Sequence, residues 1–366
     1  MTKCKLGDIC EIVSGSTPKT SIAEYWDGDV KWITPAELSD DTYIIMDSVR
    51  KITKLAVEKT GLRSIPKGTV ILSSRAPIGK VAIAGCELYC NQGFKNLICS
   101  DVINNKYLYW FLRGNTIFLN SLGRGATFKE ISKSIVSEIE INIPSIMQQK
   151  KVVENLEKLN RIVSIRKQEL QLLDQLVRGR FVELFGDPVI NQKSWKKKRF
   201  DEICENLDSR RRPISSENRI EGAYPYYGAS GIVDYVEDFI FDEDILLISE
   251  DGANLRMRSS PIAFSVSGKV WVNNHAHVVR FKKMRLQKYV EIYFSLIDIS
   301  DSITGSAQPK LNQAKLNAMM IPIPDSALLE QYGEFLKQID KSKLIVQKEL
   351  DETQLLFDSL MQEYFG

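Results

Sequence analysis

Histidine is scarce in this sequence, which contains only His275 and His277 in 366 residues. A Ser-His-Asp or Cys-His catalytic site would need one of them. Both lie in the alternating run WVNNHAHVV, so they share one face of the strand that the alternation predicts. We interpret them as structural or ligand-contacting side chains, which leaves little material for nucleophilic or acid–base catalysis.

Cysteine, net charge and long apolar runs are also limited. The six cysteines include no Cys-x-x-Cys pair, are too few for a disulfide framework and have no usual zinc spacing. The net charge of +2 does not by itself indicate nucleic-acid binding, although a local stripe of Lys and Arg would suffice for it. No apolar run approaches the roughly 20 residues of a membrane span, and the first ten residues lack a signal-peptide core. We therefore expect a cytoplasmic protein with no membrane partner.

Nucleotide-binding motifs are missing as well. GRGATF at 123–128 lacks a third glycine, and APIGK at 76–80 lacks both the first glycine and the Ser or Thr of a phosphate loop. No Asn-Pro-Pro-aromatic stretch of the kind used by amino-methyltransferases occurs. We expect a non-catalytic chain that holds no metal and no cofactor of its own.

An internal repeat is what the sequence does contain. KLGDICEI at 5–12 matches RFDEICEN at 199–206, and INIP at 141–144 matches IPIP at 321–324. Beyond the second match, eight identical residues follow at an unbroken displacement of 180 over about 31 positions. A chain of this length also exceeds the size at which single cores usually stop growing. The chain therefore repeats two kinds of segment in the order A–B–A′–B′, where each A segment precedes and each B segment follows an INIP-type match.

The B segments are predicted to be two long helices. Residues 148–184 and 328–364 contain no proline, and their apolar residues recur every three and four positions, as in a coiled-coil seam. The first carries a net charge of +3 and the second −4, which favours pairing with each other. Because a whole domain lies between them, we expect the pairing to be antiparallel. Arg166, Arg180 and Lys343 fall on the seam, where they either fix the register or extend their charged ends to solvent.

The A segments read as α+β modules. Four runs have the pattern of strands between turns, at 70–72, 81–84, 245–248 and 269–272. Two short helices, at 106–112 and 288–296, match at a displacement of 182. The predicted fold class is thus α+β, with two globular domains that alternate with two long helices paired as an antiparallel coiled coil. The predicted domains are 1–145, 146–187, 188–325 and 326–366.

Polar residues lie where the two A segments differ. Lys and Arg cluster at 193–199 and 210–212, where they would contact phosphates or form a solvated linker face. Asn91 and Gln92 lie at positions matched to 273–275, near a displacement of 183. Amide side chains in such places either read adenine edges or cap turns, and both interpretations stay open.

Besides the segment order and the Gly–polar–INIP–helix passage at 125–160, the chain contains five distinctive strings: SGSTPKT at 14–20, NQGF at 91–94, YPYYGASGIVDY at 224–235, SEDGANL at 249–255 and WVNNHAHV at 271–278. In these features it resembles the DNA specificity subunit of type I restriction-modification systems, over essentially its whole length. The family usually has Glu before Gln at the start of the first long helix, whereas this chain has Gln148–Gln149.

The resemblance implies a set of roles and partners. Each A segment would be a target-recognition domain that reads one half of a split sequence in double-stranded DNA. The paired helices would act as a ruler; a helix of 37 residues is about 55 Å long, which limits the reach to roughly 16 base pairs. Two methyltransferase subunits would use S-adenosylmethionine to modify adenines, and two restriction subunits would use ATP and Mg²⁺.

We also predict the residues that contact DNA. In the first module they are Ser74, Arg75, Asn91, Gln92, Lys95, Thr127 and Lys129. In the second they are Arg210, Arg211, Tyr227, Asp251, Asn254, Arg256, His275 and Gln308. The alternative function is a non-catalytic scaffold, in which a coiled coil displays two modules that bind ligands other than DNA.

Overall fold

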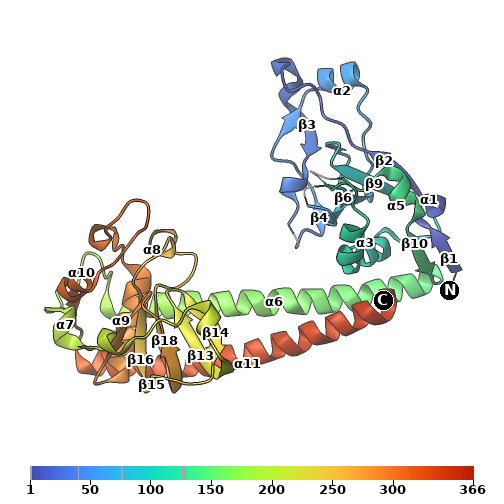
Figure 1. The fold of residues 1–366 in the computed structure, drawn as a ribbon. Coiled ribbons are helices and arrows are strands. Elements are labelled where there is room, and N and C mark those ends of the chain that lie inside the picture. The colour runs from blue at the N-terminus through green and yellow to red at the C-terminus, as the bar shows by residue number, and fades with distance from the viewer. Residues whose placement is uncertain (1, 40, 76, 126–128) are drawn as a thin grey trace. The chain divides into compact units, whose positions relative to one another are not determined.

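The computed structural model describes all residues except 1, 40, 76 and 126–128. The chain divides into two compact units (Figure 1). The first unit comprises Met1–Arg166 and Glu349–Gly366, and the second comprises Lys167–Lys348. Two helices of 40 residues, α6 (Ile146–Phe185) and α11 (Ser326–Phe365), each contribute one part to each unit. Among the described residues, no helix is long and apolar enough to cross a membrane.

In the part of the first unit that the structure describes, the strands form three sheets. The largest has the order β2-β9-β6-β7-β4, and its pairs are antiparallel except β4 with β7. Its strands are β2 (Cys10–Ser14), β9 (Phe94–Cys99), β6 (Val70–Ser73), β7 (Val81–Ala84) and β4 (Ile44–Ile45). The smaller sheets are β5-β3-β8 and β1-β10, formed by β5 (Lys51–Ile52), β3 (Trp26–Ile33), β8 (Tyr89–Cys90), β1 (Thr2–Lys5) and β10 (Glu140–Ile143).

The helix α3 (Asn105–Gly114) packs on β6 and β7 of the first unit. The Asn104 side chain caps it by accepting hydrogen bonds from the backbone N–H groups of Lys106 and Tyr107. All residues from 107 to 112 are buried, so this helix forms much of the core. The remaining helices of the unit are short: α1 (Leu6–Ile9), α2 (Lys54–Thr60), α4 (Thr116–Ser121) and α5 (Lys133–Glu138), with single 3₁₀ turns at Ala23–Tyr25 and Pro35–Glu37.

The second unit repeats this frame. Its main sheet has the order β12-β19-β16-β17, and the others are β14-β13-β18-β15 and β11-β20. The strands are β12 (Glu205–Asn206), β19 (Ala276–Arg280), β16 (Ile245–Ser249), β17 (Ala263–Val266), β14 (Gly231–Val236), β13 (Glu221–Gly228), β18 (Lys269–Val272), β15 (Phe241–Asp242), β11 (Lys197–Arg199) and β20 (Met320–Pro322). The helices are α7 (Phe200–Ile203), α8 (Asn254–Met257), α9 (Met284–Leu296) and α10 (Gln313–Ala318), with 3₁₀ turns at Asp208–Arg210, Ser216–Asn218 and Ser300–Ser302.

The two sequence matches coincide with one repeated sheet. Lys5 pairs with Glu140 between β1 and β10, and Arg199 pairs with Met320 between β11 and β20. The displacements are 194 (199 − 5) and 180 (320 − 140), which are those of the two sequence matches. In both units the strand is followed by a single helical turn, α1 or α7. The internal repeat inferred from the sequence is therefore a repeat of backbone pairing.

The long helices pair antiparallel inside each unit. In the first unit the start of α6 meets the end of α11, where the Asn155 amide donates to the Tyr364 hydroxyl over 3.3 Å. In the second unit the end of α6 meets the start of α11, where the Tyr332 hydroxyl donates to the Val177 carbonyl over 3.1 Å. The predicted helices 148–184 and 328–364 and their direction of pairing are thus confirmed.

Two of the three seam cations join the helices. Arg166 lies 2.7 Å from the Glu349 carboxylate in the first unit, and Lys343 lies 2.6 Å from Asp174 in the second. Arg180 instead pairs with an acid of its own helix. Exposed ion pairs contribute little to stability, but charges of opposite sign at fixed positions favour one register over its neighbours.

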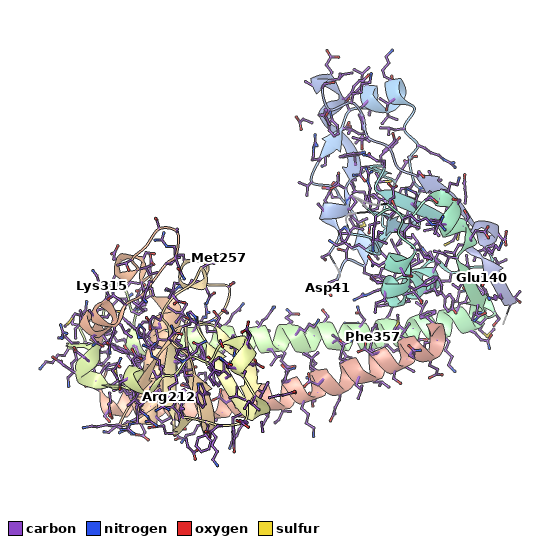
Figure 2. The ribbon with its side chains drawn as sticks, in the orientation of Figure 1. Asp41, Glu140, Arg212, Met257, Lys315 and Phe357 are labelled. Atoms are coloured by element: carbon purple, nitrogen blue, oxygen red, sulfur yellow. The ribbon has the colours of Figure 1, made fainter. Side chains whose placement is uncertain are left out.

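Aromatic residues fasten the helices to each globular domain. In the first unit Trp110 of α3 packs edge-on against Phe357 of α11, with 5.6 Å between ring centroids; Figure 2 labels Phe357 on α11. In the second unit Phe181 of α6 stacks on Tyr289 of α9 at 5.1 Å and meets Tyr332 of α11 at 5.8 Å. Because all these rings are buried, each unit has a core shared between its domain and its helix segments.

Candidate nucleic-acid interface

The predicted contact residues of the second unit gather mainly at one edge of its main sheet. There β16 ends at Ser249 and β19 begins at Ala276, and these two residues pair. A loop that contains residues 304–310 lies against this edge. The backbone of its residue Lys310 forms isolated β-bridges with Thr304 and with Asp251. We call this place the loop edge of the second unit.

An ion network organises the loop edge of the second unit. The Arg211 guanidinium lies 2.6 Å from Glu250 and 3.4 Å from Asp208, and it donates to the Ala276 carbonyl over 2.8 Å. Lys310 binds the other oxygen of Glu250 at 3.0 Å. Burial acts to raise the pKa of Glu250, but the hydrogen bonds from Arg211 and Lys310 outweigh it and hold the pKa below its usual value. The network therefore favours an ionised Glu250.

His277 completes this network from β19 and is 1% exposed. Its Nδ1 lies 2.6 Å from Asp208 and its Nε2 lies 2.7 Å from the Leu311 carbonyl. Burial acts to raise the pKa of Asp208, yet the hydrogen bond and charge of His277 hold it below its usual value. His277 is thus a structural histidine, as the sequence suggested.

Asp208, Glu250 and His277 place ligand-type atoms within 4.8 Å of one another. This grouping has the composition of a metal site. However, the Arg211 guanidinium already lies against both carboxylates, and both ring nitrogens of the histidine have partners. Arg211 supplies the positive charge that the carboxylates require, so the residues fit an ion network better than a metal centre.

The predicted residues at this edge differ in solvent exposure and in whether their polar groups are already hydrogen-bonded within the unit. His275 is exposed and its Nδ1 lies 2.9 Å from Asp251. Gln308 is exposed, and so is Arg256, whose guanidinium donates to the Gly305 carbonyl over 3.3 Å. These side chains reach solvent and can approach a ligand.

Three other predicted residues are used inside the unit. Both ends of the Asn254 amide bond the backbone of Ser260, at 3.0 and 3.1 Å, so this side chain shapes the loop around α8. Tyr227 of β13 is half-buried, and burial raises its pKa. Arg210 points away from its neighbour Arg211: it pairs with Glu243 at 2.6 Å, before the start of β16. Arg210 is therefore the one residue of this set that lies at the other end of the sheet.

The first unit has a loop edge at the same place, where β6 ends at Ser73 and β9 begins at Phe94. The Lys95 ammonium, on a side chain only 7% exposed, lies 3.2 Å from the Ser74 hydroxyl and 3.1 Å from Glu130. Arg75 lies 3.7 Å from the same carboxylate. The structure thus gathers three predicted residues around Glu130, which the sequence did not indicate.

The remaining predicted residues of the first unit are Asn91, Gln92, Lys129 and Thr127. Gln92 and Lys129 are exposed, and Gln92 is hydrogen-bonded to the Thr17 hydroxyl. Thr127 lies outside the described residues. Asn91 caps a turn by accepting the Gly93 N–H over 2.9 Å.

The same turn occurs in the second unit, where Asn273 accepts the His275 N–H over 2.8 Å. The displacement between Asn91 and Asn273 is 182 (273 − 91), which corrects the value of 183 expected from the sequence. The capping alternative describes what these two amides do in the structure. Gln92 and Asn274, the next residues along the chain, are exposed.

An ion pair of the same kind ties the loop to the sheet in each unit, with its charges reversed. In the first unit the loop supplies Glu130 and the strand supplies Lys95. In the second the loop supplies Lys310, 180 positions later, and Glu250 follows the strand. We call these two pairs the loop latches. Sequence analysis missed Glu130, Glu250 and Lys310, although the displacement of 180 relates the two loop residues.

Comparisons with known proteins establish the family. The model of the type I restriction modification DNA specificity domain matches residues 1–175 and again 192–354. The chain belongs to this family. The two matched ranges cover most of the chain, in agreement with the internal repeat, and they confirm the resemblance found in the sequence.

Curated members of the specificity-subunit family resemble this chain over most of its length. The type I restriction enzyme MjaIX specificity subunit of Methanocaldococcus jannaschii is 30% identical, over 98% of this chain and 90% of that protein. The EcoprrI specificity subunit of Escherichia coli is 23% identical, over 91% of this chain and 88% of that protein.

Solved structures of the family share the fold. The S subunit from M. genitalium covers 100% of this chain and 96% of its own, with a TM-score of 0.62 at 16% identity. A chain solved in work on complex assembly and conformational transition of the type I R-M system gives a TM-score of 0.59 at 14% identity, with 100% and 97% covered. The α+β class with two specificity domains and long helices is therefore that of the family.

Proposed function

We propose that this chain is the sequence-reading subunit of a type I restriction-modification complex, and that each unit reads one half of a split target in double-stranded DNA. The observation that carries the proposal is the repeated loop edge. Both units hold the same backbone frame there but present different side chains. A frame that is repeated with different loops is suited to reading two different sequences.

The bonding of the predicted residues refines their proposed roles. Exposed side chains such as Gln92 and Lys129, or His275 and Gln308, would contact base edges or phosphates. Ser74, Lys95, Arg211 and Asn254 are bonded within their units and would position the loops. Arg75, Asn91, Thr127, Arg210, Tyr227, Asp251 and Arg256 complete the proposed interface.

The long helices would set the gap between the half-sites. Each has 40 residues, which is about 60 Å at 1.5 Å per residue. Their antiparallel pairing in both units and the two cross-helix ion pairs support a single register. A fixed register is what a ruler requires, since slippage by one turn would change the gap.

The partners would be two adenine methyltransferase subunits, which use S-adenosylmethionine, and two restriction subunits, which use ATP and Mg²⁺. This chain would direct them in the cytoplasm and do no chemistry itself. Exposed apolar side chains at repeat-related positions of the long helices support one docking surface in each unit. Ile165 and Leu356 are 48% and 51% exposed in the first unit, and their counterparts Ile345 and Leu176 are 59% and 52% exposed in the second. One such surface in each unit fits two copies of one partner.

The test is genome-wide adenine methylation in cells that receive this chain with its methyltransferase, against cells that receive the methyltransferase alone. We expect a new split motif only when both are present. Methylation that is absent, or identical without this chain, would contradict the proposal and favour the scaffold function.

A further inference from the structure

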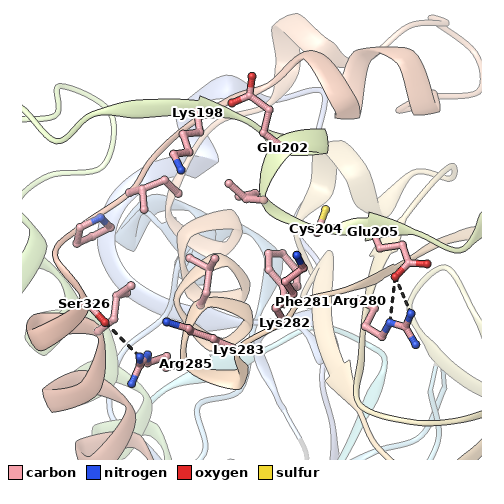
Figure 3. Close-up of a pocket in the computed structure, with 15 residues that line it drawn as sticks. Lys198, Glu202, Cys204, Glu205, Arg280, Phe281, Lys282, Lys283, Arg285 and Ser326 are labelled. Atoms are coloured by element: carbon pink, nitrogen blue, oxygen red, sulfur yellow. Dashed lines mark hydrogen bonds and ion pairs between the residues drawn. The ribbon is translucent and has the colours of Figure 1, made fainter.

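A pocket of about 710 Å³ lies in the second unit, at the end of β19 opposite its loop edge (Figure 3). It is lined by α7, by the segment between β19 and α9, and by the start of α11. Its apolar lining includes Ile203, Leu286, Pro324 and Leu329. Among the residues proposed to read DNA, Arg210 lies near this pocket, because Glu243 binds both Arg210 and the lining residue Arg280 at 2.6 and 2.7 Å. Those at the loop edge lie at the opposite end of β19.

The pocket carries an excess of positive charge. Lys198, Lys282 and Lys283 line it, are exposed, and have no ion partner among the described residues. The two arginines of the lining differ: Arg280 binds Glu205 at 2.6 Å, and Arg285 is held by residues of α11. Glu202 also lines the pocket, is exposed and has no ion partner among the described residues, so three lysines and one carboxylate are the charged groups available to a ligand.

The matched position in the first unit is occupied by Gln149, which is fully buried. Its amide nitrogen donates to the carbonyls of Val102 and Pro144 at 3.0 Å, and its amide oxygen accepts the Asn104 N–H over 2.8 Å. These bonds join the start of α6 to the loop before α3. A partner would have to break them to enter here, and each broken bond would leave a buried polar group unpaired.

The second unit has no glutamine at this position and therefore lacks these hydrogen bonds. The counterpart of Gln149 at a displacement of 180 is Leu329, whose side chain makes no hydrogen bond. The helix α9 begins at Met284, three residues before the position that corresponds to the start of α3 (105 + 182 = 287). The loop groups that Gln149 binds are thus replaced by helix. In addition, Lys282 and Lys283 stand where the first unit has Ser100 and Asp101.

The pocket continues along α11. A second pocket of about 390 Å³ shares Lys283 and Arg285 with the first and is lined by Gly333 and Leu336 of α11. Its further charged lining is mixed and mostly paired internally, and comprises Lys288, Glu330, Glu334, Lys337 and Asp340. The combined groove can hold a segment of several residues rather than one side chain. The lysines without an ion partner lie around the first pocket, so an acidic group would bind there and the rest of the segment would follow α11. An apolar floor suits a protein segment, since the backbone of duplex DNA offers phosphates but no apolar side chain to fill it.

We propose that this groove binds an acidic segment of the methyltransferase subunit that carries a large apolar side chain. The inference rests on the proposed function. It goes further because the matched positions of the first unit hold Ser100, Asp101 and the buried Gln149 in place of Lys282, Lys283 and Leu329. The two methyltransferase subunits therefore bind with unequal affinity, and the copy at the second unit is held more tightly.

The experiment titrates purified methyltransferase onto the full chain and resolves the 1:1 and 2:1 complexes by native mass spectrometry. The test variant is Lys282→Glu/Lys283→Glu, with Lys282→Gln/Lys283→Gln as a milder form. The matched control is Lys59→Glu/Lys67→Glu, which makes the same charge change at exposed lysines of the first unit. We expect two unequal binding steps for the wild type. The test variant should weaken the tighter step about tenfold or more, the Gln variant should weaken it less, and the control should change neither step.

Several results would overturn the inference. They are equal steps in the wild type, equal loss at both steps in the test variant, or unchanged steps together with weaker, salt-dependent DNA binding, which would place DNA in the groove. Failure of the proposed function looks different, because the wild type would then bind no methyltransferase or give no split motif. A wild type that yields a motif but shows equal steps rejects only the groove.

Discussion

The two units share a backbone frame, and in each an ion pair joins the loop to the sheet, but the positions of the two charges are exchanged. In the first, Glu130 of the loop meets Lys95; in the second, Lys310 of the loop meets Glu250. The frame is held by strand pairing and apolar burial, which do not depend on the sign of a charge. Polar groups at the loop edge can therefore change while the loops stay anchored, and this leaves each unit free to present its own surface.

The largest expected effect comes from changing what the units share. Deleting one heptad from the middle of α6, together with the opposing heptad of α11, shortens both helices by about 10 Å. We expect the gap in the methylated motif to shrink by about three base pairs, while both half-site sequences stay the same. Sequencing of methylated adenines measures both, and an unchanged gap would refute the ruler.

The shared cores can be broken one unit at a time. Trp110→Ala in the first unit and Phe181→Ala in the second each remove a fully buried ring, and each should lower the free energy of unfolding by about 3–5 kcal/mol. Hydrogen exchange should rise mainly in the unit that carries the change. Equal loss of protection in both units would show that they do not have separate cores.

The loop latch of the first unit offers a more local change. Glu130→Lys places a third cation beside Lys95 and Arg75, and we expect a loss of about 1–3 kcal/mol together with weaker methylation at one half-site only. The double variant Lys95→Glu/Glu130→Lys copies the polarity of the second unit and should recover most of the stability. Thermal unfolding and half-site preference are the measurements, and a double variant no better than the single one would argue against a latch.

The smallest effect concerns pH. The folded pKa values of Asp208 and Glu250 lie below their usual values, so the stability that they contribute is present above about pH 4 and is lost as the pH falls through the folded pKa. Asp208→Asn should lower stability at neutral pH and flatten its decline below pH 4. Denaturation at a series of pH values tests this, and a parallel curve for the variant would contradict it.

The sequence predicted the features that depend on local periodicity. Val81–Ala84 and Lys269–Val272 are strands as expected, and the long helices extend only one or two residues beyond their predicted ends. The resemblance leads one to expect Glu at position 148, and the Gln148 amide that stands there accepts hydrogen bonds from the Ser145 N–H and hydroxyl at 3.1 and 3.0 Å. Patterns of this kind act through neighbours a few residues away, so one segment suffices to recognise them.

The site residues were harder to predict from the sequence, because their interaction partners are distant in the chain. Nothing in the sequence around Glu130 indicates that β9 places Lys95 beside it. Asn254 was predicted to contact a base, but its amide is hydrogen-bonded to the backbone of Ser260 in its own loop. Arg210 and Arg211 are adjacent in sequence and point to different ends of one sheet. None of these directions follows from residue type or spacing alone.

The division of the chain has a consequence for the order of synthesis. The second unit is one continuous stretch, Lys167–Lys348, whereas the first needs Glu349–Gly366. Trp110 and Tyr107 obtain their partners Phe357 and Phe365 from residues 349–366. During translation from the N-terminus, the first unit is thus begun before the second and completed after it, so a chain with a finished first unit already carries the whole of the second.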